Sequence, residues 1–412
     1  MAYITRHLEE VVLRLSGSFQ VILVTGPRQA GKTTMLRRLV EKEGRNRGYV
    51  TLDDLDARAL AKSDPKLFLQ LNPAPLLIDE AQYAPELFSY IKIAVDDRQS
   101  PGDYWMTGSQ IFRLMRGVQE SLAGRVALLH LSPLSQREIE GAGNRVFMPD
   151  FDMLSQEARQ YAGQGQLSAA ECYERIWKGC MPGVISGQYA DTDIYYSSYV
   201  STYIERDVHD IVGAVDALKF KGFITSAAAR TGQLLNYQGL AQDSDISQAT
   251  AKSWINILET LGLVFLLHPY SNNTLKRLIK TPKLYFYDTG LVCHLTKWSN
   301  YEVAMAGAMS GALLETYAIS EVLKTYQNAG RVGHLYFYRD KDAKEIDLLL
   351  ERDGLLHPLE VKKAVSPDSR LAQVFKAIDK PPLQRGTGGV LCLAERLTAL
   401  DKDNLVIPVG MI

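Results

Sequence analysis

The chain has 412 residues, enough for two or three domains that each bury a core of their own. It is 46% hydrophobic and 23% charged, the composition of an ordinary soluble globular protein. The net charge of -1 excludes attraction to nucleic acid or anionic membranes through the charge of the whole chain, so such a role requires a local basic patch.

The chain shows no sign of secretion or membrane insertion. No apolar core of a signal peptide follows Met1, and the longest apolar runs fall well short of the roughly 20 residues of a membrane span. The four cysteines have no CxxC pair and no ligand-like spacing. They indicate reduced, mostly buried thiols, so we expect a cytoplasmic protein that does not contact membranes.

Residues 1–140 alternate between strand and helix patterns, which predicts an α/β domain with a parallel sheet covered by helices on both faces. The expected strands are 20–24, 48–52, 75–78, 103–106 and 126–131. The helical patterns between them are 32–43, 85–97 and 111–117.

Within this region, the GxxxxGK[ST] pattern of a P-loop lies between an apolar strand and a helix. Its glycines allow backbone N–H groups to point at phosphates, and the positive end of the following helix stabilises the anion. Lys32 adds a charge near the β and γ oxygens, and the Thr33 hydroxyl is a Mg²⁺ ligand. The predicted nucleotide contacts are Gly26, Pro27, Arg28, Gln29, Ala30, Gly31, Lys32, Thr33 and Thr34.

An apolar strand that ends in two acids supplies the partner of the P-loop. Asp79 is expected to hold the Mg²⁺ shell, and Glu80 to orient and polarise the attacking water. The run after Asp79 lacks the Asp-x-x-Gly of GTPases, and no Asn-Lys-x-Asp motif follows. The motifs therefore predict ATP, rather than GTP, as the nucleotide.

Two further residues are expected near the γ-phosphate. Ser109 follows the strand 103–106 and is our preferred sensor, with Thr107 and Gln110 as competitors and a plain helix N-cap as an alternative role. Arg125 is a candidate arginine finger, an effect of about 10³–10⁵ in rate, and a surface salt bridge is its alternative. A finger that acts in trans implies a homo-oligomer.

Residues 151–282 are expected to be mainly helical and to include a winged helix: helices at 236–243 and 247–261, then a strand at 264–270. Ser247 is the expected N-cap of the recognition helix, which leaves Gln248, Thr250, Lys252 and Ser253 for a DNA groove. Trp254, Ile257, Leu258 and Leu261 have core-facing spacing.

The segment 275–283 carries four cations and no acid, and is expected to be a phosphate-contacting wing, so DNA is the predicted partner. A lid or a protomer contact is the alternative role of this module. Arg206 is a possible second sensor of the nucleotide, with a helix-surface ion pair as its alternative.

The last region, 284–412, combines a long helix at 311–328 with strands at 335–338, 345–350, 357–362 and 390–394, and a helix at 368–378. Asp347, Glu360 and Lys362 have the Asp-x(n)-Glu-x-Lys pattern of PD-(D/E)xK nucleases. Glu360 and Lys362 face the same way on one strand, and Asp347 from a paired strand can meet Glu360 around a divalent cation. Lys362 is expected beside the nucleophilic water or the scissile phosphate, and Glu315 is a fourth member of the set.

With these motifs, the chain resembles the bacterial and archaeal AAA-type ATPases that carry a C-terminal domain of unknown function 4143. The resemblance runs almost end to end and includes the segments 122–125, 131–135, 179–183, 203–208, 281–290 and 345–362. It departs at Cys180, where relatives often have a second glycine. It implies an ATPase core, a winged-helix-like middle and a C-terminal α/β domain like that of restriction endonucleases.

Two functions follow from these features. The first is an ATPase whose turnover drives the winged helix and a metal-dependent nuclease-like domain that act on nucleic acid. The second is an ATP-gated regulatory, toxin–antitoxin or defence-type binding protein with a catalytically silent C-terminal domain.

Overall fold

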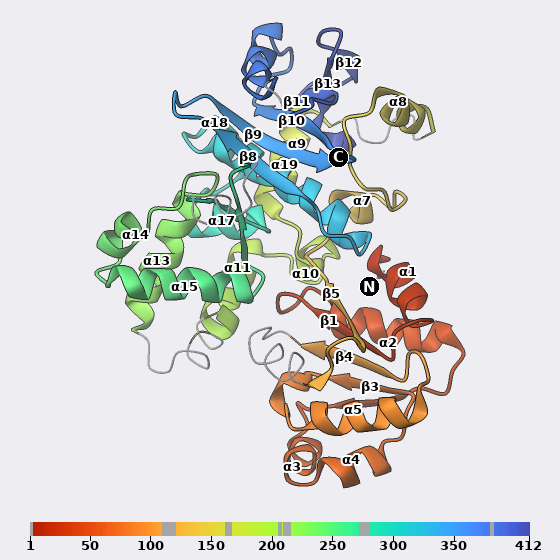
Figure 1. The fold of residues 1–412 in the computed structure, drawn as a ribbon. Helices are drawn as coiled ribbons and strands as arrows, with labels where there is room; N and C mark the ends of the chain where they lie inside the picture. Colours follow the sequence, from red (N-terminus) through yellow and green to blue (C-terminus); the bar gives the residue numbers. More distant parts are fainter. Residues whose placement is uncertain are drawn as a thin grey trace.

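The computed structural model of the chain describes residues 3–108, 121–160, 167–204, 208, 216–271, 281–379 and 383–412. Figure 1 shows an N-terminal α/β region at one end of the molecule, a C-terminal sheet at the other, and helices between and beside them. The predictions for Ser109, Gln110, Arg206, the helix 111–117 and the wing residues 275–280 lie outside the described residues.

The N-terminal region is built on a five-stranded parallel sheet of order β2-β3-β4-β1-β5. Its strands are β1 (Val21–Thr25), β2 (Gly48–Thr51), β3 (Leu76–Asp79), β4 (Tyr104–Gly108) and β5 (Val126–His130). All five predicted strands are confirmed to within two residues at each end. Strand β4 separates β1 from β3, and β2 lies at the edge of the sheet.

Helices cover both faces of this sheet, as predicted. The described helices are α1 (Leu8–Leu15), α2 (Lys32–Glu43), α3 (Leu55–Ser63), α4 (Pro65–Leu71), α5 (Leu87–Arg98) and the 3₁₀ turn η1 (Ala81–Tyr83). Side chains that alternate along β1 separate into two cores, with Ile22 and Val24 packed with α1 and α2, and Val21 and Leu23 packed with α3, α4 and α5.

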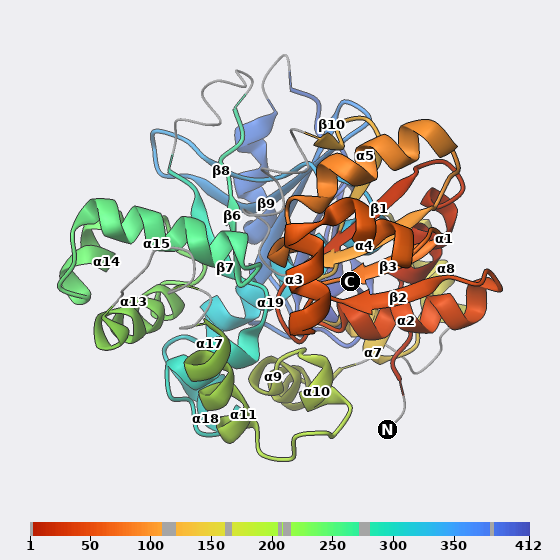
Figure 2. The ribbon, with the colours of Figure 1, turned by 90° about the horizontal axis from the view of Figure 1, so that it is seen from below.

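The middle region is helical, as expected. Its elements are α7 (Gln136–Ile139), α8 (Phe151–Gln160), α9 (Ala169–Lys178), α10 (Pro182–Ile185), α11 (Thr192–Tyr199), the π-helical turn η2 (Val200–Ile204), α13 (Ala217–Ala229), α14 (Tyr237–Asp243) and α15 (Gln248–Thr260). Seen from below in Figure 2, helices α13, α14 and α15 project on the side of the molecule away from α1 and α2.

Three helices and a strand pair follow one another from α13 (Ala217–Ala229) onward. Helices α14 and α15 are followed by an antiparallel pair of strands, β6 (Val264–Leu267) and β7 (Lys283–Phe286). Ser247 caps α15 by accepting a hydrogen bond from the Thr250 backbone N–H, at 3.0 Å. The four side chains with core-facing spacing in and after α15, from Trp254 to Leu261, are buried. Since β7 pairs with β6, the hairpin spans the boundary expected between residues 282 and 284.

The C-terminal region holds a six-stranded mixed sheet of order β12-β13-β11-β10-β9-β8. The strands are β8 (Leu335–Arg339), β9 (Glu345–Arg352), β10 (Leu355–Lys362), β11 (Gly388–Cys392), β12 (Thr398–Ala399) and β13 (Asn404–Pro408). The helices are α17 (Thr289–Leu295), α18 (Tyr301–Ala306), α19 (Ser310–Asn328) and the 3₁₀ segments η3 (Ser369–Ile378) and η4 (Val409–Met411). The expected helix 368–378 is therefore a 3₁₀ helix, and β7, β12 and β13 are strands that the sequence patterns did not indicate.

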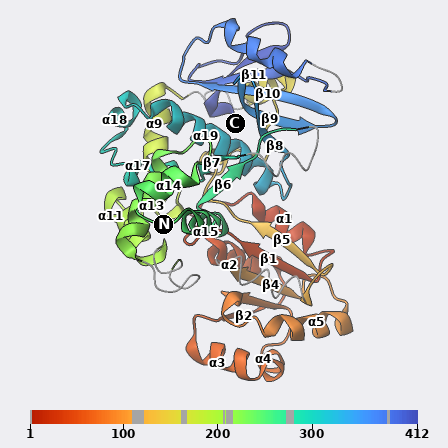
Figure 3. The same ribbon diagram turned by 60° about the vertical axis from the view of Figure 1, so that its left-hand side comes forward.

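The middle and C-terminal regions share one hydrophobic core, which extends from Phe147 to Ile412. Helix α19 lies in this core and packs against β10 of the C-terminal sheet and β7 of the hairpin. Figure 3 shows the C-terminal sheet at the opposite end of the molecule from helices α3, α4 and α5. Among the helices that the structure describes, none combines the length and the hydropathy needed to cross a bilayer.

Candidate nucleotide site and carboxylate cluster

The P-loop connects β1 to α2 in a conformation that depends on its glycines. Gly26 has φ +139°, and a Cβ at this position would collide with the backbone carbonyl of Leu131. Gly31 precedes α2 with φ +92°, a left-handed conformation that favours glycine. The first turn of the 12-residue helix α2 therefore faces the loop with its unbonded N–H groups, as a phosphate site requires.

A buried arginine that the sequence patterns did not indicate fixes the outside of the loop. Arg6 donates to the carbonyl of Ala30 at 2.6 Å and to that of Ser132 at 2.7 Å. Its Nε lies 3.0 Å from Oε1 of Glu138, in an ion pair with both side chains buried. Arg6 thus joins the P-loop to the segment after β5, which keeps the loop in register with the sheet.

The predicted Mg²⁺ ligands lie together. The Thr33 hydroxyl donates to Oδ1 of Asp79 at 2.6 Å, and the Thr107 hydroxyl donates to the same oxygen at 2.5 Å. Thr33 and Asp79 both offer oxygen atoms, which a hard cation such as Mg²⁺ prefers as ligands. The two residues therefore fit this ion. Thr107, the competitor of Ser109 as sensor, is buried and oriented by Asp79.

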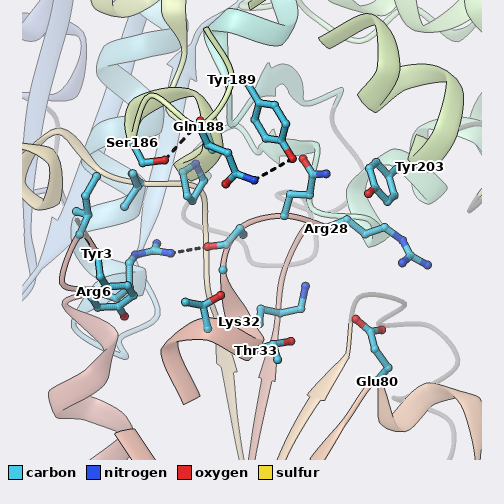
Figure 4. A pocket seen from close by; sticks show the side chains of 18 residues that line it. Tyr3, Arg6, Arg28, Lys32, Thr33, Glu80, Ser186, Gln188, Tyr189 and Tyr203 are labelled. Atoms are coloured by element: carbon cyan, nitrogen blue, oxygen red, sulfur yellow. Dashed lines mark hydrogen bonds between the residues drawn. The ribbon is translucent and has the colours of Figure 1, made fainter. Parts of the chain in front are cut away.

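Glu80 follows Asp79 with a left-handed backbone, φ 55°, which is unusual for a residue other than glycine and indicates local strain. Its N–H donates to the Thr107 hydroxyl at 3.0 Å, and its carboxylate accepts a hydrogen bond from the Gln82 amide. Figure 4 shows the Glu80 carboxylate on the far side of the pocket from Tyr3 and Arg6, across from Lys32. This position suits a base acting on a water beside the terminal phosphate.

Lys32 is buried, and its ammonium donates to the carbonyls of Gly26 and Pro27, at 3.0 and 2.9 Å. The loop and helix α2 form the floor of a cavity of about 500 Å³, a size typical of small-molecule sites. Seven of the predicted nucleotide contacts line it: Arg28, Gln29, Ala30, Gly31, Lys32, Thr33 and Thr34. Gly26 and Pro27 lie in the buried base of the loop.

The opposite wall of the cavity comes from the middle region, and motif analysis missed it. It is formed by Pro182, Gly183, Ser186, Gln188, Tyr189 and Tyr203, and Figure 4 shows several of these side chains above the loop. The Tyr199 hydroxyl donates to the carbonyl of Arg28 at 3.3 Å, so α11 also contacts the loop. The only sequence signal for this wall was the family resemblance at residues 179–183 and 203–208.

A second contact links the P-loop to the hairpin module. Gly262, in the turn between α15 and β6, has φ +71°, and a Cβ there would lie 3.0 Å from Pro27 and 3.2 Å from His130. Burial, and then the charge of Lys32, lower the pKa of His130 to about 4. His130 is thus a neutral imidazole held between the sheet, the loop and the turn.

Arg125 lies at the opposite end of strand β1 from the P-loop of its own chain. Its carbonyl accepts a hydrogen bond from the N–H of Val21, the first residue of β1, whereas the loop follows the last residue of that strand. The separation is the length of β1, roughly 17 Å. The guanidinium pairs with Asp96 at 2.5 Å on the exposed surface, as in the alternative prediction. Only a finger that acts on a neighbouring protomer is compatible with this position.

In the C-terminal sheet the predicted acids meet as expected. Leu348 of β9 pairs with Leu359 of β10, and Asp347 and Glu360 lie one residue beyond this pair on their strands. Oδ2 of Asp347 accepts a hydrogen bond from the Val361 N–H at 2.9 Å. Lys362 Nζ lies 2.7 Å from Oε1 of Glu360 and 3.7 Å from Oδ2 of Asp347.

A second lysine, Lys283 of β7, enters this cluster. Its ammonium lies 2.6 Å from Oε1 of Glu345, 3.1 Å from Oε1 of Glu315 and 3.8 Å from Oδ1 of Asp347. The Tyr285 hydroxyl donates to the same oxygen of Glu315 at 2.6 Å. The prediction that Lys283 is a phosphate-contacting wing residue is therefore wrong, because its side chain is only 4% exposed and faces the carboxylates.

Burial and mutual repulsion shift the pKa values of the acids in this cluster. Burial, and then the Asp347 carboxylate, raise the pKa of Glu360 to about 7. The same two causes raise the pKa of Glu315. Burial by itself would lower the pKa of Lys283, but the carboxylates of Glu315, Asp347 and Glu345 outweigh it and raise that pKa.

The cluster does not fit a metal ion in this arrangement. Among the described residues, no group of three or more His, Cys, Asp or Glu side chains is placed so that it could hold one. The ammonium groups of Lys283 and Lys362 instead lie among the carboxylates of Glu315, Asp347 and Glu360. The metal-ligand role of these three acids stays a prediction.

Comparison with known proteins gives three matching family models. Residues 18–140 match a family described as AAA domain, residues 170–302 a domain of unknown function (DUF8612), and residues 310–412 a domain of unknown function (DUF4143). The "uncharacterized protein" Rv2008c of Mycobacterium tuberculosis and its counterpart Mb2031c of Mycobacterium bovis are each 30% identical over 349 residues. In both cases the match covers 84% of this chain and 71% of the relative.

Solved structures are more distant. The Walker-type ATPase PABY2304 of Pyrococcus abyssi is 14% identical with a TM-score of 0.44, and the match covers 72% of this chain and 98% of that one. DnaA of Aquifex aeolicus with bound AMPPCP is 14% identical with a TM-score of 0.30, over 61% of this chain and 85% of that one.

Proposed function

Since the chain belongs to the family of AAA-domain proteins that carry a C-terminal DUF4143 domain, we propose that it hydrolyses ATP at the P-loop and uses the turnover to move its winged-helix-like and C-terminal modules on nucleic acid. The observation that carries the proposal is the 2.6 Å contact between Thr33 and Asp79, with Glu80 beside the same cavity.

The residues have distinct roles in this proposal. The N–H groups at the start of α2 and the ammonium of Lys32 bind the phosphates, and Thr33 and Asp79 would hold Mg²⁺. When bound there, Mg²⁺ would supply positive charge beside the phosphates. Glu80 takes the proton of the attacking water, and Thr107 orients Asp79 and the Glu80 backbone.

Coupling to the rest of the chain is supported by contacts at the loop. The Tyr199 hydroxyl bonds the carbonyl of Arg28, and the Gly262 turn lies against Pro27. Any change in the loop between ATP and ADP states thus reaches α11 and the hairpin module directly. Residues of the cavity wall, such as Gln188 and Tyr189, would sense the same change.

The ATPase part is tested by phosphate release from ATP. Lys32→Ala is expected to abolish binding and turnover, whereas Glu80→Gln is expected to bind ATP and to lose hydrolysis. Normal hydrolysis by Glu80→Gln would show that another residue is the base.

The nucleic-acid part rests on the start of α15, where Gln248, Lys252 and Ser253 are exposed. Binding of a fluorescent duplex is expected to weaken in Lys252→Ala and to depend on salt. Lys221→Ala is the matched control, because Lys221 is also an exposed lysine of the module but lies on α13. Equal affinities of the two variants would favour the lid or protomer-contact role.

A second function has support of its own. The lysines among the C-terminal carboxylates favour an ATP-gated regulatory protein whose C-terminal domain does not cleave nucleic acid. Incubation of the protein with plasmid and single-stranded DNA in Mn²⁺, with Asp347→Ala as control, distinguishes the two. Cleavage that depends on Asp347 would exclude the silent domain.

A further inference from the structure

Lys283 is a buried cation that lies beside the carboxylates predicted from the sequence to bind a metal ion. It belongs to the hairpin of the winged-helix-like module, since it pairs with Leu267 on β6. Its side chain nevertheless ends among acids of α19 and β9, which belong to the C-terminal region. The ammonium is thus a charge delivered by one module to the carboxylates of another.

Carboxylate oxygens surround this ammonium. Three carboxylates, from Glu315, Glu345 and Asp347, have an oxygen within 3.8 Å of Nζ. Oxygen ligands of this kind are what Mg²⁺ and Mn²⁺ prefer. A lysine ammonium carries one charge where such an ion carries two.

An independent sign of an incomplete site is Glu360. Its Oε1 pairs with Lys362, but its Oε2 is buried and has no hydrogen-bond partner among the residues that the structure describes. The side chain is only 10% exposed, so bulk water does not satisfy this oxygen. A buried acceptor without a partner is costly, and it points to a missing cation or donor at the cluster.

The hairpin is anchored where it delivers Lys283. The N–H of Tyr270 donates to the carbonyl of Phe337 on β8 at 2.6 Å, and the N–H of Phe337 donates to the carbonyl of His268 at 3.1 Å. The Lys283 ammonium also lies 5.7 Å from the ring centre of Phe337. The hairpin and the edge of the C-terminal sheet therefore move together or separate by breaking these bonds.

We propose that Lys283 is a tethered cation that takes the place of a divalent metal ion beside Glu315, Glu345 and Asp347, so that the carboxylate cluster does not bind such an ion while this lysine is present. This inference does not depend on ATP turnover, because it concerns only the occupancy of the cluster.

The test is titration of the full chain with Mn²⁺ in the absence of nucleotide, with free Mn²⁺ followed by electron paramagnetic resonance. The wild type and the control Lys344→Met, which removes an exposed lysine one residue before Glu345, are expected to bind no Mn²⁺ that depends on Asp347. Lys283→Met is expected to bind one Mn²⁺ that depends on Asp347, at least about tenfold more tightly than any Mn²⁺ binding of the wild type. Asp347→Asn in the Lys283→Met background should remove that binding.

Three results would overturn the proposal. One is a wild type that already binds Mn²⁺ through Asp347. Another is a folded Lys283→Met variant without Mn²⁺ binding. The third is a Lys283→Met variant that stays unfolded in saturating Mn²⁺, because a metal ion that replaces the lysine charge should restore the fold. Loss of ATP hydrolysis in Lys32→Ala would leave each of these outcomes unchanged.

Discussion

The P-loop and the C-terminal cluster are made of the same side-chain types, yet they differ in what their lysines contact. In the P-loop, Lys32 donates to two neutral carbonyl oxygens beside a cavity of about 500 Å³. In the cluster, Lys283 is surrounded by carboxylates and is almost fully buried. A carbonyl oxygen carries no net charge, whereas the carboxylates offset the charge of the Lys283 ammonium. The P-loop site borders an open cavity, whereas in the cluster the protein's own carboxylates offset the lysine charge.

The largest expected effect concerns the base in the P-loop region. Glu80→Gln should lower ATP turnover by about 10²–10⁴, because a positioned general base contributes this much. The measurement is phosphate release at saturating ATP, with binding followed separately by a fluorescent analogue. Glu86→Gln, at an exposed position six residues on, is the matched control and should hydrolyse ATP at the wild-type rate.

The next prediction compares the same substitution, lysine to methionine, in the two regions. Lys283→Met should reduce the free energy of unfolding by about 3–5 kcal/mol, because it leaves buried carboxylates without their partner. Loss of the two hydrogen bonds from Lys32 to neutral carbonyls in Lys32→Met should contribute less. Urea denaturation of both variants without nucleotide and metal measures the difference. Equal losses would mean that the two lysines are not held in different ways.

The histidine beneath the P-loop gives a pH-dependent prediction. Burial, and then Lys32, lower the pKa of His130 from 6.5 to about 4, so the folded chain binds this proton less readily than the unfolded chain. The stability that this group contributes is therefore present above pH 6.5 and is lost as the pH falls towards 4. The loss amounts to about 3 kcal/mol. Thermal unfolding at a series of pH values should show a shallower decline in His130→Gln than in the wild type.

The smallest predicted effects come from a tyrosine in each region. Tyr285 donates to Glu315 at 2.6 Å in a buried position, whereas Tyr49, which is 40% exposed, donates to Asp79 at 3.4 Å. Tyr285→Phe should cost about 1.5–3 kcal/mol, the range for a hydrogen bond to a charged group, and Tyr49→Phe less than about 1 kcal/mol. If chemical denaturation ranks the two the other way, the cluster is less tightly closed than its distances indicate.

The sequence predicted the P-loop site well because its parts are local. The spacing of Gly26, Gly31 and Lys32 sets the loop, and an acid at the end of an apolar strand identifies Asp79. Both motifs carry their own strand or helix with them, so no tertiary information was needed. The helix 32–43 agrees with α2 at both ends for the same reason.

What the sequence could not predict depends on contacts between distant segments. Lys283 looked like a wing residue because its neighbours in sequence are basic, and only the pairing of β7 with β6 directs it to Glu315 and Glu345. Arg6 and the wall that includes Tyr189 have no motif of their own. Their roles arise from packing of regions more than a hundred residues apart.

Helix α19 has one more consequence. Near its start it carries Glu315 of the cluster, and near its end Gln327 bonds Ser132 and Lys324 donates to the carbonyl of Leu134, both in the segment after β5 that Arg6 ties to the P-loop. Glu315 and Gln327 are separated by about 18 Å of continuous helix. A helix of this length resists bending, so its two ends cannot be displaced independently of each other. The nucleotide pocket and the carboxylate cluster are therefore linked by a single stiff element, and a small tilt at one is a displacement at the other.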